Sequence, residues 1–289
     1  MPEPRHSHKL LDRRRHVLGC ILATLGVFSS RSQASELPNS SVSKPRTWPV
    51  ELEAGKFKIH CNFHLASADS LIKELLRTSE SVTKLLHLPQ PKTETHVVLF
   101  ESSQEYGKYM RNYFPQLPQR RALYIQDRGP GMLFTYVHEE LAEDLRHEVT
   151  HAILNDQLGK GNRQLPLWVD EGVAEYFEAP QDLRFLNPKR TLETRSLLAN
   201  SNQIRAIEVL ETYQDVSEFG DLEYRDSWLW IHFLIHRNQE TRGLFIDWLS
   251  SHRKAKNHLP LGKSVRLQVP AVEDELRDHL VELTTRVGK

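Results

Sequence analysis

Apolar and polar residues alternate in several short stretches of the chain, and a period of two residues is typical of strands with one buried face. The clearest stretch begins at Phe57, where Phe57, Ile59, Cys61 and Phe63 fall on one side of an extended chain. Gly and Pro residues between positions 127 and 131 indicate a turn between the last two stretches. The predicted strands are residues 57–63, 95–100, 122–126 and 132–138.

Other stretches repeat their apolar residues every three or four positions, which is typical of amphipathic helices. Ser102 and Glu105 form a capping box at the start of one short helix. Residues 179–207 have no regular pattern. The predicted helices are residues 67–87, 102–114 and 139–158, a helix that begins near Pro166, and residues 224–237, 241–252 and 272–287.

This order of elements predicts an α+β fold. Strands and helices alternate through residues 49–138, which we interpret as the N-terminal α/β part, and residues 139–289 are mainly helical. We expect a small mixed or antiparallel sheet packed on the helix at 139–158, followed by a helical lobe. A chain of 289 residues suits one domain with two lobes.

Residues 1–34 have the composition of an export signal. Three arginines precede an apolar run at 17–28, and small residues before position 35 suit cleavage. Arg14 and Arg15 also resemble a twin-arginine signal, so either export route is expected, to the periplasm or beyond. If the apolar run is retained, it anchors the protein to the membrane instead. Residues 35–48, rich in Ser and Pro, read as a linker.

The charge of the chain is balanced, with 38 basic and 38 acidic residues. After removal of the signal the acidic groups are in slight excess, so we expect no nucleic-acid partner and no stable membrane insertion. Cys20 lies in the signal and Cys61 is then single, so no disulfide within the chain is predicted.

The candidate chemistry begins with the sequence His147-Glu148-Val149-Thr150-His151 in the predicted helix at 139–158. Positions i and i+4 share a helix face, so His147 and His151 can present two imidazoles to one metal ion. A zinc ion with three protein ligands keeps a position for water and lowers the pKa of that water to about 7. Glu148 can then act as general base.

The third ligand is predicted in the next helix. Nineteen residues separate His151 from Glu171, and a turn near 159–162 would let this helix return to the histidines. Two His and one Glu form a known catalytic zinc set. Glu175 lies one turn later and can accept a hydrogen bond from a ligand His, and Asp170 is a second candidate for such a supporting role. Glu175 and Asp170 are also the next candidates for the third ligand.

The motif resembles that of the gluzincin zinc metallopeptidases, including thermolysin-like enzymes. The segment WVDEGVAEYFE resembles the W-L-N-E-G-x-A segment of aminopeptidases in that clan, and the chain is most similar to short secreted bacterial proteins of the peptidase MA-like type. The resemblance implies a zincin-like fold, with His147, His151 and Glu171 as zinc ligands. It implies that Glu148 is the catalytic base and that Glu175 supports a ligand. The strong match covers about 35 residues.

The resemblance also implies two further features. Gluzincins bind extended substrate on an edge strand beside the zinc helix, and residues 132–138 are the candidate strand, with an ordinary edge strand as the alternative. Tyr224 is a candidate for stabilising the oxyanion, with a packing role as the alternative. His232 and His236 form a second i, i+4 pair, which we interpret as core or helix-surface histidines because no Glu follows His232 and apolar residues surround them.

We therefore expect an exported zinc metallopeptidase that hydrolyses peptide bonds of a peptide or protein substrate. Two alternatives stay open. The chain can be a binding or scaffold protein whose zinc is structural or absent, because fold does not determine function. It can also be a zinc hydrolase of non-peptide amides.

Overall fold

The computed structural model describes residues 48–65, 68–126, 129–159, 164–195, 197, 204–254 and 259–287. The expected export signal and nearly all of the expected linker lie outside these ranges, as does most of the turn expected near 159–162. Within them, no helix combines the length and the apolar character needed to cross a membrane.

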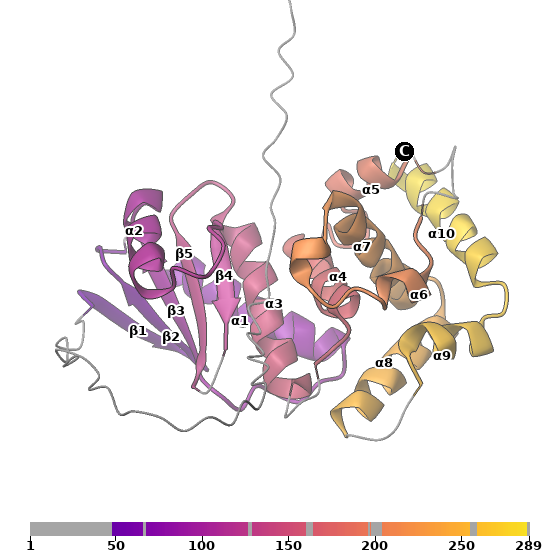
Figure 1. The fold of residues 1–289 in the computed structure, drawn as a ribbon, viewed down its shortest axis with the longest axis horizontal. Helices are drawn as coiled ribbons and strands as arrows, with labels where there is room; N and C mark the ends of the chain where they lie inside the picture. Colours follow the sequence, from indigo (N-terminus) through magenta and orange to yellow (C-terminus); the bar gives the residue numbers. More distant parts are fainter. Residues whose placement is uncertain are drawn as a thin grey trace, which may run out of the picture.

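The first part of the described chain forms a five-stranded mixed sheet with the order β1-β2-β3-β5-β4 (Figure 1). The two central pairings, β2 with β3 and β3 with β5, are parallel, and the two outer pairings are antiparallel. The strands are β1 (Val50–Ala54), β2 (Phe57–Cys61), β3 (Thr95–Phe100), β4 (Ala122–Ile125) and β5 (Gly131–Tyr136).

Helices cover both faces of the sheet because successive strand residues point to opposite sides. Val97 and Leu99 of β3 belong to the main core, together with residues of α1 (Ala68–Leu85) and α3 (Leu141–Leu158). Val98 and Phe100 belong to a second, aromatic-rich core with α2 (Ser103–Tyr113). The side chain of Ser102 accepts a hydrogen bond from the Glu105 backbone, which is one half of the predicted capping box, whereas the Glu105 carboxylate accepts a hydrogen bond from Asn62.

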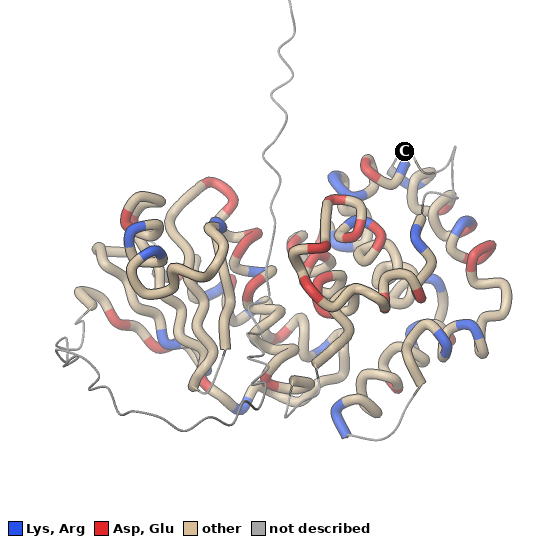
Figure 2. Tube along the Cα trace, viewed as in Figure 1, with Lys and Arg blue, Asp and Glu red and all other residues tan. Residues whose placement is uncertain are grey.

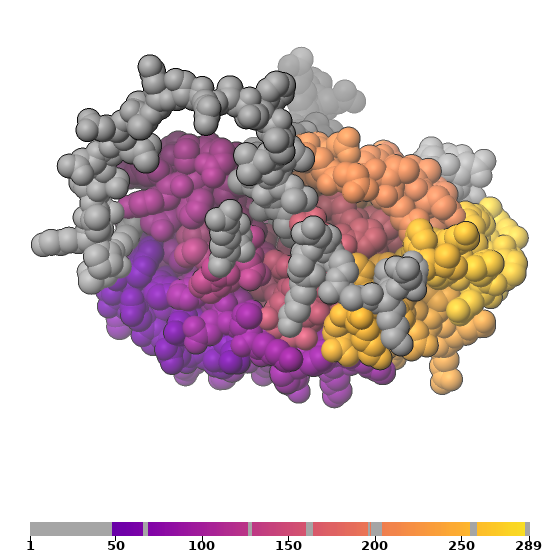
Figure 3. Space-filling view, turned by 60° about the horizontal axis from the view of Figure 1, so that its bottom comes forward, coloured from indigo at the N-terminus to yellow at the C-terminus, as the bar shows by residue number. Residues whose placement is uncertain are grey.

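The second part is helical and lies beside α3 (Figure 1). Figure 3 shows this part, in orange to yellow, meeting the sheet part, in indigo to magenta, on the face that it draws. The α+β architecture with a mixed sheet is thus as predicted. The elements are α4 (Leu167–Glu178), α5 (Pro188–Arg195), α6 (Ile207–Leu210), the 3-10 helix η3 (Val216–Glu218), α7 (Asp221–His236), α8 (Gln239–Arg253), α9 (Leu261–Gln268) and α10 (Val272–Val287).

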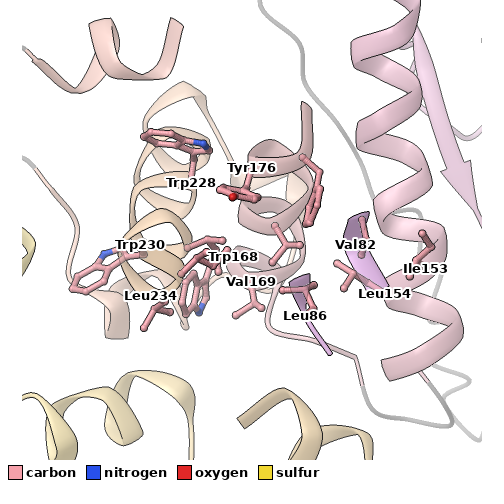
Figure 4. Packing of buried hydrophobic residues seen from close by; sticks show 14 of the residues in the cluster. Val82, Leu86, Ile153, Leu154, Trp168, Val169, Tyr176, Trp228, Trp230 and Leu234 are labelled. Atoms are coloured by element: carbon pink, nitrogen blue, oxygen red, sulfur yellow. The ribbon is translucent and has the colours of Figure 1, made fainter. Parts of the chain in front are cut away.

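Helix α4 lies between α3 and α7, and its buried aromatic side chains fill the space between them (Figure 4). Trp168 on α4 and Trp228 on α7 are both fully buried. Helices α4 and α7 are in close contact at Gly172, where an added Cβ would lie 2.7 Å from the carbonyl oxygen of Ser227. Only glycine fits there, and the contact fixes α7 against the helix that carries Glu171.

The sequence predictions did not include β1, α6, η3 or α9, and two further features of the fold differ from them. Residues 132–138 were expected to include an edge strand, but β5 pairs with β3 on one side and β4 on the other, so that prediction is wrong. The edge strand next to α3 is β4. The segment 179–207, expected to be irregular, contains α5. Such features are difficult to predict from a short or weakly periodic sequence, because they depend on contacts with residues far away in the chain.

Of the second histidine pair, His232 is fully buried and His236 is half-buried, and both belong to a cluster that joins α4, α7 and α10. His232 Nε2 lies 3.0 Å from the carbonyl oxygen of Phe185 and must donate to it, so its Nδ1 accepts from His279 Nε2 at 2.8 Å. His236 Nε2 lies 2.9 Å from the Tyr176 hydroxyl. Burial lowers the pKa of all three histidines, to about 4 for His236 and His279.

We expect acid to destabilise the protein through this cluster. The unfolded histidines bind protons below pH 6.5, whereas the folded ones resist protonation until about pH 4, so stability present above pH 6.5 is lost as the pH falls through this window. The loss is about 3 kcal/mol for each fully shifted histidine. Urea unfolding at stepped pH measures it. The variant His279→Gln should show a shallower dependence, and an unchanged slope would contradict the assignment.

Candidate metal centre

Helix α3 places the two motif histidines at the boundary between the sheet part and the helical part. Val149 and Ile153 pack in the main core, which orients the helix. His147 and His151 are almost completely buried, at 0% and 2% exposure. Their Nε2 atoms lie 3.0 Å apart, so both rings point to the same place, as the i, i+4 spacing predicted.

Helix α4 brings Glu171 to the same place. Its Oε2 lies 3.6 Å from His147 Nε2 and 3.7 Å from His151 Nε2, and the side chain is fully buried. One ligand atom from each residue lies within 4.8 Å of the others, an arrangement that could hold a metal ion. The structure therefore brings together the three residues predicted as ligands.

The outward-facing nitrogens of both imidazoles contact carboxylates. His147 Nδ1 lies 2.9 Å from Glu178 Oε1, and His151 Nδ1 lies 3.1 Å from Asp170 Oδ2. When these nitrogens carry the protons, both Nε2 atoms present lone pairs toward Glu171. Glu175 was expected to make such a contact, but its carboxylate pairs with Arg190 of α5 instead.

Glu148 lies outside the group of three possible ligand atoms and contacts the edge strand of the sheet. Its Oε2 accepts a hydrogen bond from the backbone N–H of Tyr124 at 2.7 Å. Tyr124 lies in β4, so the strand holds this carboxylate beside the histidines without adding it to the ligand group. The glutamate of the motif and the free edge of the sheet therefore meet.

The charges of the site fit a bound cation. Burial lowers the pKa of His151, but the nearby charges of Asp170 and Glu171 outweigh it and raise that pKa to about 10. Burial raises the pKa of Glu171 to about 8, although His151 opposes this. Both oxygens of Glu171 lack a hydrogen-bond partner among the described residues, which is costly for a buried carboxylate. A divalent cation would satisfy these oxygens and the two lone pairs together.

Tyr224, the candidate oxyanion residue, lies at the start of α7 and is buried. Its ring packs edge-on against Phe219. Burial raises the pKa of its hydroxyl, and the charges of Glu171 and Glu148 raise it further while Arg120 opposes them. The hydroxyl is thus within electrostatic reach of both glutamates.

Three residues of the site were not predicted from the sequence, namely Glu178, Arg190 and Arg120. The sequence signal for Glu178 was present, because residues 171, 175 and 178 share one helix face. Arg190 had no signal, since it lies in the weakly patterned segment before α7. Arg120 precedes β4, and its charge acts on both Glu171 and Tyr224.

Comparisons with known proteins do not assign the chain to a family. No family model matches the chain, and no curated protein matches it. Any assignment of function depends on the residues of the site themselves.

We expect the purified protein to bind about one metal ion per chain through these three ligands. The variants His147→Ala, His151→Ala and Glu171→Ala should lose the ion or bind it much more weakly, whereas the exposed His64→Ala should behave as wild type. Elemental analysis after equilibration with limiting zinc measures this. Full metal content in Glu171→Ala would move the third ligand to Asp170 or Glu175.

Proposed function

We propose that the protein is a zinc-dependent metallopeptidase with a zincin-like arrangement of its α3 and α4 helices. The observation that carries the proposal is the convergence of His147 Nε2, His151 Nε2 and Glu171 Oε2, with Glu148 on the adjacent turn. Two imidazoles and one carboxylate suit zinc and leave a position for water. The carboxylates behind both imidazoles support the same assignment, because such contacts fix the tautomer of a ligand histidine.

When bound, the zinc ion would supply Lewis acidity and a water of lowered pKa. Glu148 is the residue to which we assign proton transfer. The N–H of Tyr124 holds its Oε2, so the carboxylate has a fixed orientation on the side of the sheet edge. In the proposed reaction this carboxylate takes a proton from the attacking water and later gives it to the leaving amine. The fixed orientation lowers the entropic cost of that transfer.

The edge strand β4 is the proposed binding site for an extended peptide. An added strand pairs with N–H and C=O groups on the outer side of an edge strand, and this edge lies beside the motif helix, where the N–H of Tyr124 already donates to Glu148. A peptide paired with β4 would pass close to Glu148. This assignment replaces the one that the sequence suggested for residues 132–138.

Tyr224 is the proposed donor to the negative charge that develops on the peptide carbonyl. Burial and the nearby carboxylates keep its hydroxyl protonated, which a donor requires. Arg120 adds a positive charge on the same side of the site.

One observation favours a binding or scaffold protein with a structural metal. His147 and Glu171 have no exposed surface, and Glu148 is only 3% exposed, so the site is enclosed. Structural zinc sites are closed, whereas catalytic sites keep an open position. The residue pattern itself supports catalysis, since a purely structural metal site needs no general base such as Glu148.

Hydrolysis of a non-peptide amide would use the same residues, and substrate profiling separates it from peptide hydrolysis. Export of the protein remains part of the proposal.

The variant Glu148→Gln should keep its metal but lose peptide hydrolysis by about a hundred- to ten-thousand-fold, because an amide cannot accept the proton. An amide oxygen can still accept the Tyr124 hydrogen bond, so the fold is preserved. Cleavage of a peptide library and zinc content are measured together. Glu143→Gln, on the same helix and paired with Lys189, is the matched control. Full activity in Glu148→Gln would rule out this mechanism.

The variant Tyr224→Phe should lower kcat by about a hundredfold with little change in KM or zinc content, since one transition-state donor is removed. Tyr213→Phe removes a hydroxyl that contacts Glu223 outside the metal centre and serves as control. Equal kcat values for Tyr224→Phe and wild type would leave Tyr224 with a packing role only.

A further inference from the structure

The carboxylates of Glu175 and Glu178 both lie close to one nitrogen atom of His147. Glu175 and Glu178, one helical turn apart on α4, each place an oxygen so that these atoms and a nitrogen of His147 lie within 4.8 Å of one another. Both carboxylates are 97% buried. Two like charges this close in the interior repel strongly, and an imidazole Nδ1–H can donate a good hydrogen bond to only one of them.

A guanidinium group resolves this conflict. Arg190 of α5 pairs with Glu175 and, at 2.7 Å, with Glu193 of its own helix. Arg190 is itself buried, with 6% of its surface exposed. This side chain therefore supplies a positive charge beside the two carboxylates, which would otherwise need a metal ion to balance them. Glu178 is the carboxylate that contacts His147, at 2.9 Å.

Glu178 is also held in place through its backbone. The Nε of Arg146 donates to the carbonyl oxygen of Glu178, and its Nη1 donates to Glu74 of α1 at 2.8 Å. Arg146 directly precedes His147 on α3, so the end of α4 is tied to the turn that carries the imidazole. Glu175 has no comparable tie to α3 among the contacts of the described residues.

We propose that Arg190 is a positioning residue of the metal centre. By holding Glu175, it makes Glu178 the carboxylate that fixes the tautomer and orientation of His147. This inference rests on the proposed function in one respect, because it takes His147 as a ligand through Nε2. The contacts of Arg190 that bear on this role are its ion pairs with Glu175 and Glu193, and it acts through the choice between two carboxylates.

The test is a double-mutant cycle read out as zinc affinity, measured on the full chain by competition with a chromophoric chelator. Glu178→Gln should weaken zinc binding by about ten- to a hundredfold, as expected for a carboxylate behind a ligand histidine. Glu175→Gln is the matched control and should change it by no more than about threefold, since Gln can still accept from Arg190.

The decisive variant combines Arg190→Met with Glu178→Gln. Without the guanidinium, Glu175 is released and can take the place of Glu178 at His147. The double variant should therefore bind zinc at least about fivefold more tightly than Glu178→Gln alone. A double variant no better than the single one overturns the proposal, and so does a Glu175→Gln variant as weak as Glu178→Gln.

A spectroscopic measurement excludes a merely structural effect. In metal-free protein, ¹⁵N NMR of labelled histidine should show His147 protonated on Nδ1 in wild type and in Glu175→Gln, with loss of this single tautomer in Glu178→Gln. A mixture of tautomers in wild type would contradict the proposal. If Arg190→Met does not fold, Arg190→Gln takes its place, and the comparison of the two glutamate variants still decides which carboxylate serves His147.

Failure of this inference is distinct from failure of the proposed function. Zinc binding with the expected pattern but without peptide hydrolysis would overturn the function and leave the positioning role intact. Hydrolysis with the opposite pattern would overturn only the positioning role. Absence of zinc binding in wild type would overturn both.

Discussion

The structure depends on the requirement that every carboxylate buried between α3 and α4 has a positive or hydrogen-bonding partner. An unpaired charge in the interior costs several kcal/mol, so carboxylates at this boundary constrain everything around them. Asp170 and Glu178 are satisfied by the two imidazoles, Glu148 by the backbone of β4, and Glu175 by α5. Among the described residues, neither oxygen of Glu171 has a hydrogen-bond partner, although both Nε2 atoms lie within 3.7 Å of its Oε2, and this imbalance is the physical reason why a cation would fit here.

The same boundary explains why the remaining elements lie where they do. Because α7 packs tightly on Gly172, its first turn brings Tyr224 toward the carboxylate of Glu171. Helix α5 lies against α10 and α7 and presents Arg190 to α4. The acidic segments before α7 and at the start of α3 lie on either side of this region (Figure 2). The helical part therefore does more than cover the sheet, because it supplies the groups that balance the charges of the site.

Local sequence was sufficient for the residues that share a helix turn. His147 and His151 meet because i, i+4 spacing on any regular helix brings their side chains together. It could not choose between Glu175 and Glu178, since both lie on the face of α4 that carries Glu171. The choice is made by Arg190, and its helix arises from a segment without clear periodicity, so only the packed structure shows the partner.

The sequence by itself determined the α+β class, the long helices and the convergence of His147 with His151, because these follow from periodicity and from spacing within a helix; the approach of Glu171 to them needed the packing of α4 on α3. The tertiary structure decided which strand is the edge. Both β4 and β5 have an apolar pattern typical of strands, but β5 pairs with β3 as well as with β4. It also decided which carboxylates stand behind the histidines. Pairing between strands and charge compensation across helices join residues far apart in the chain, and no local pattern encodes them.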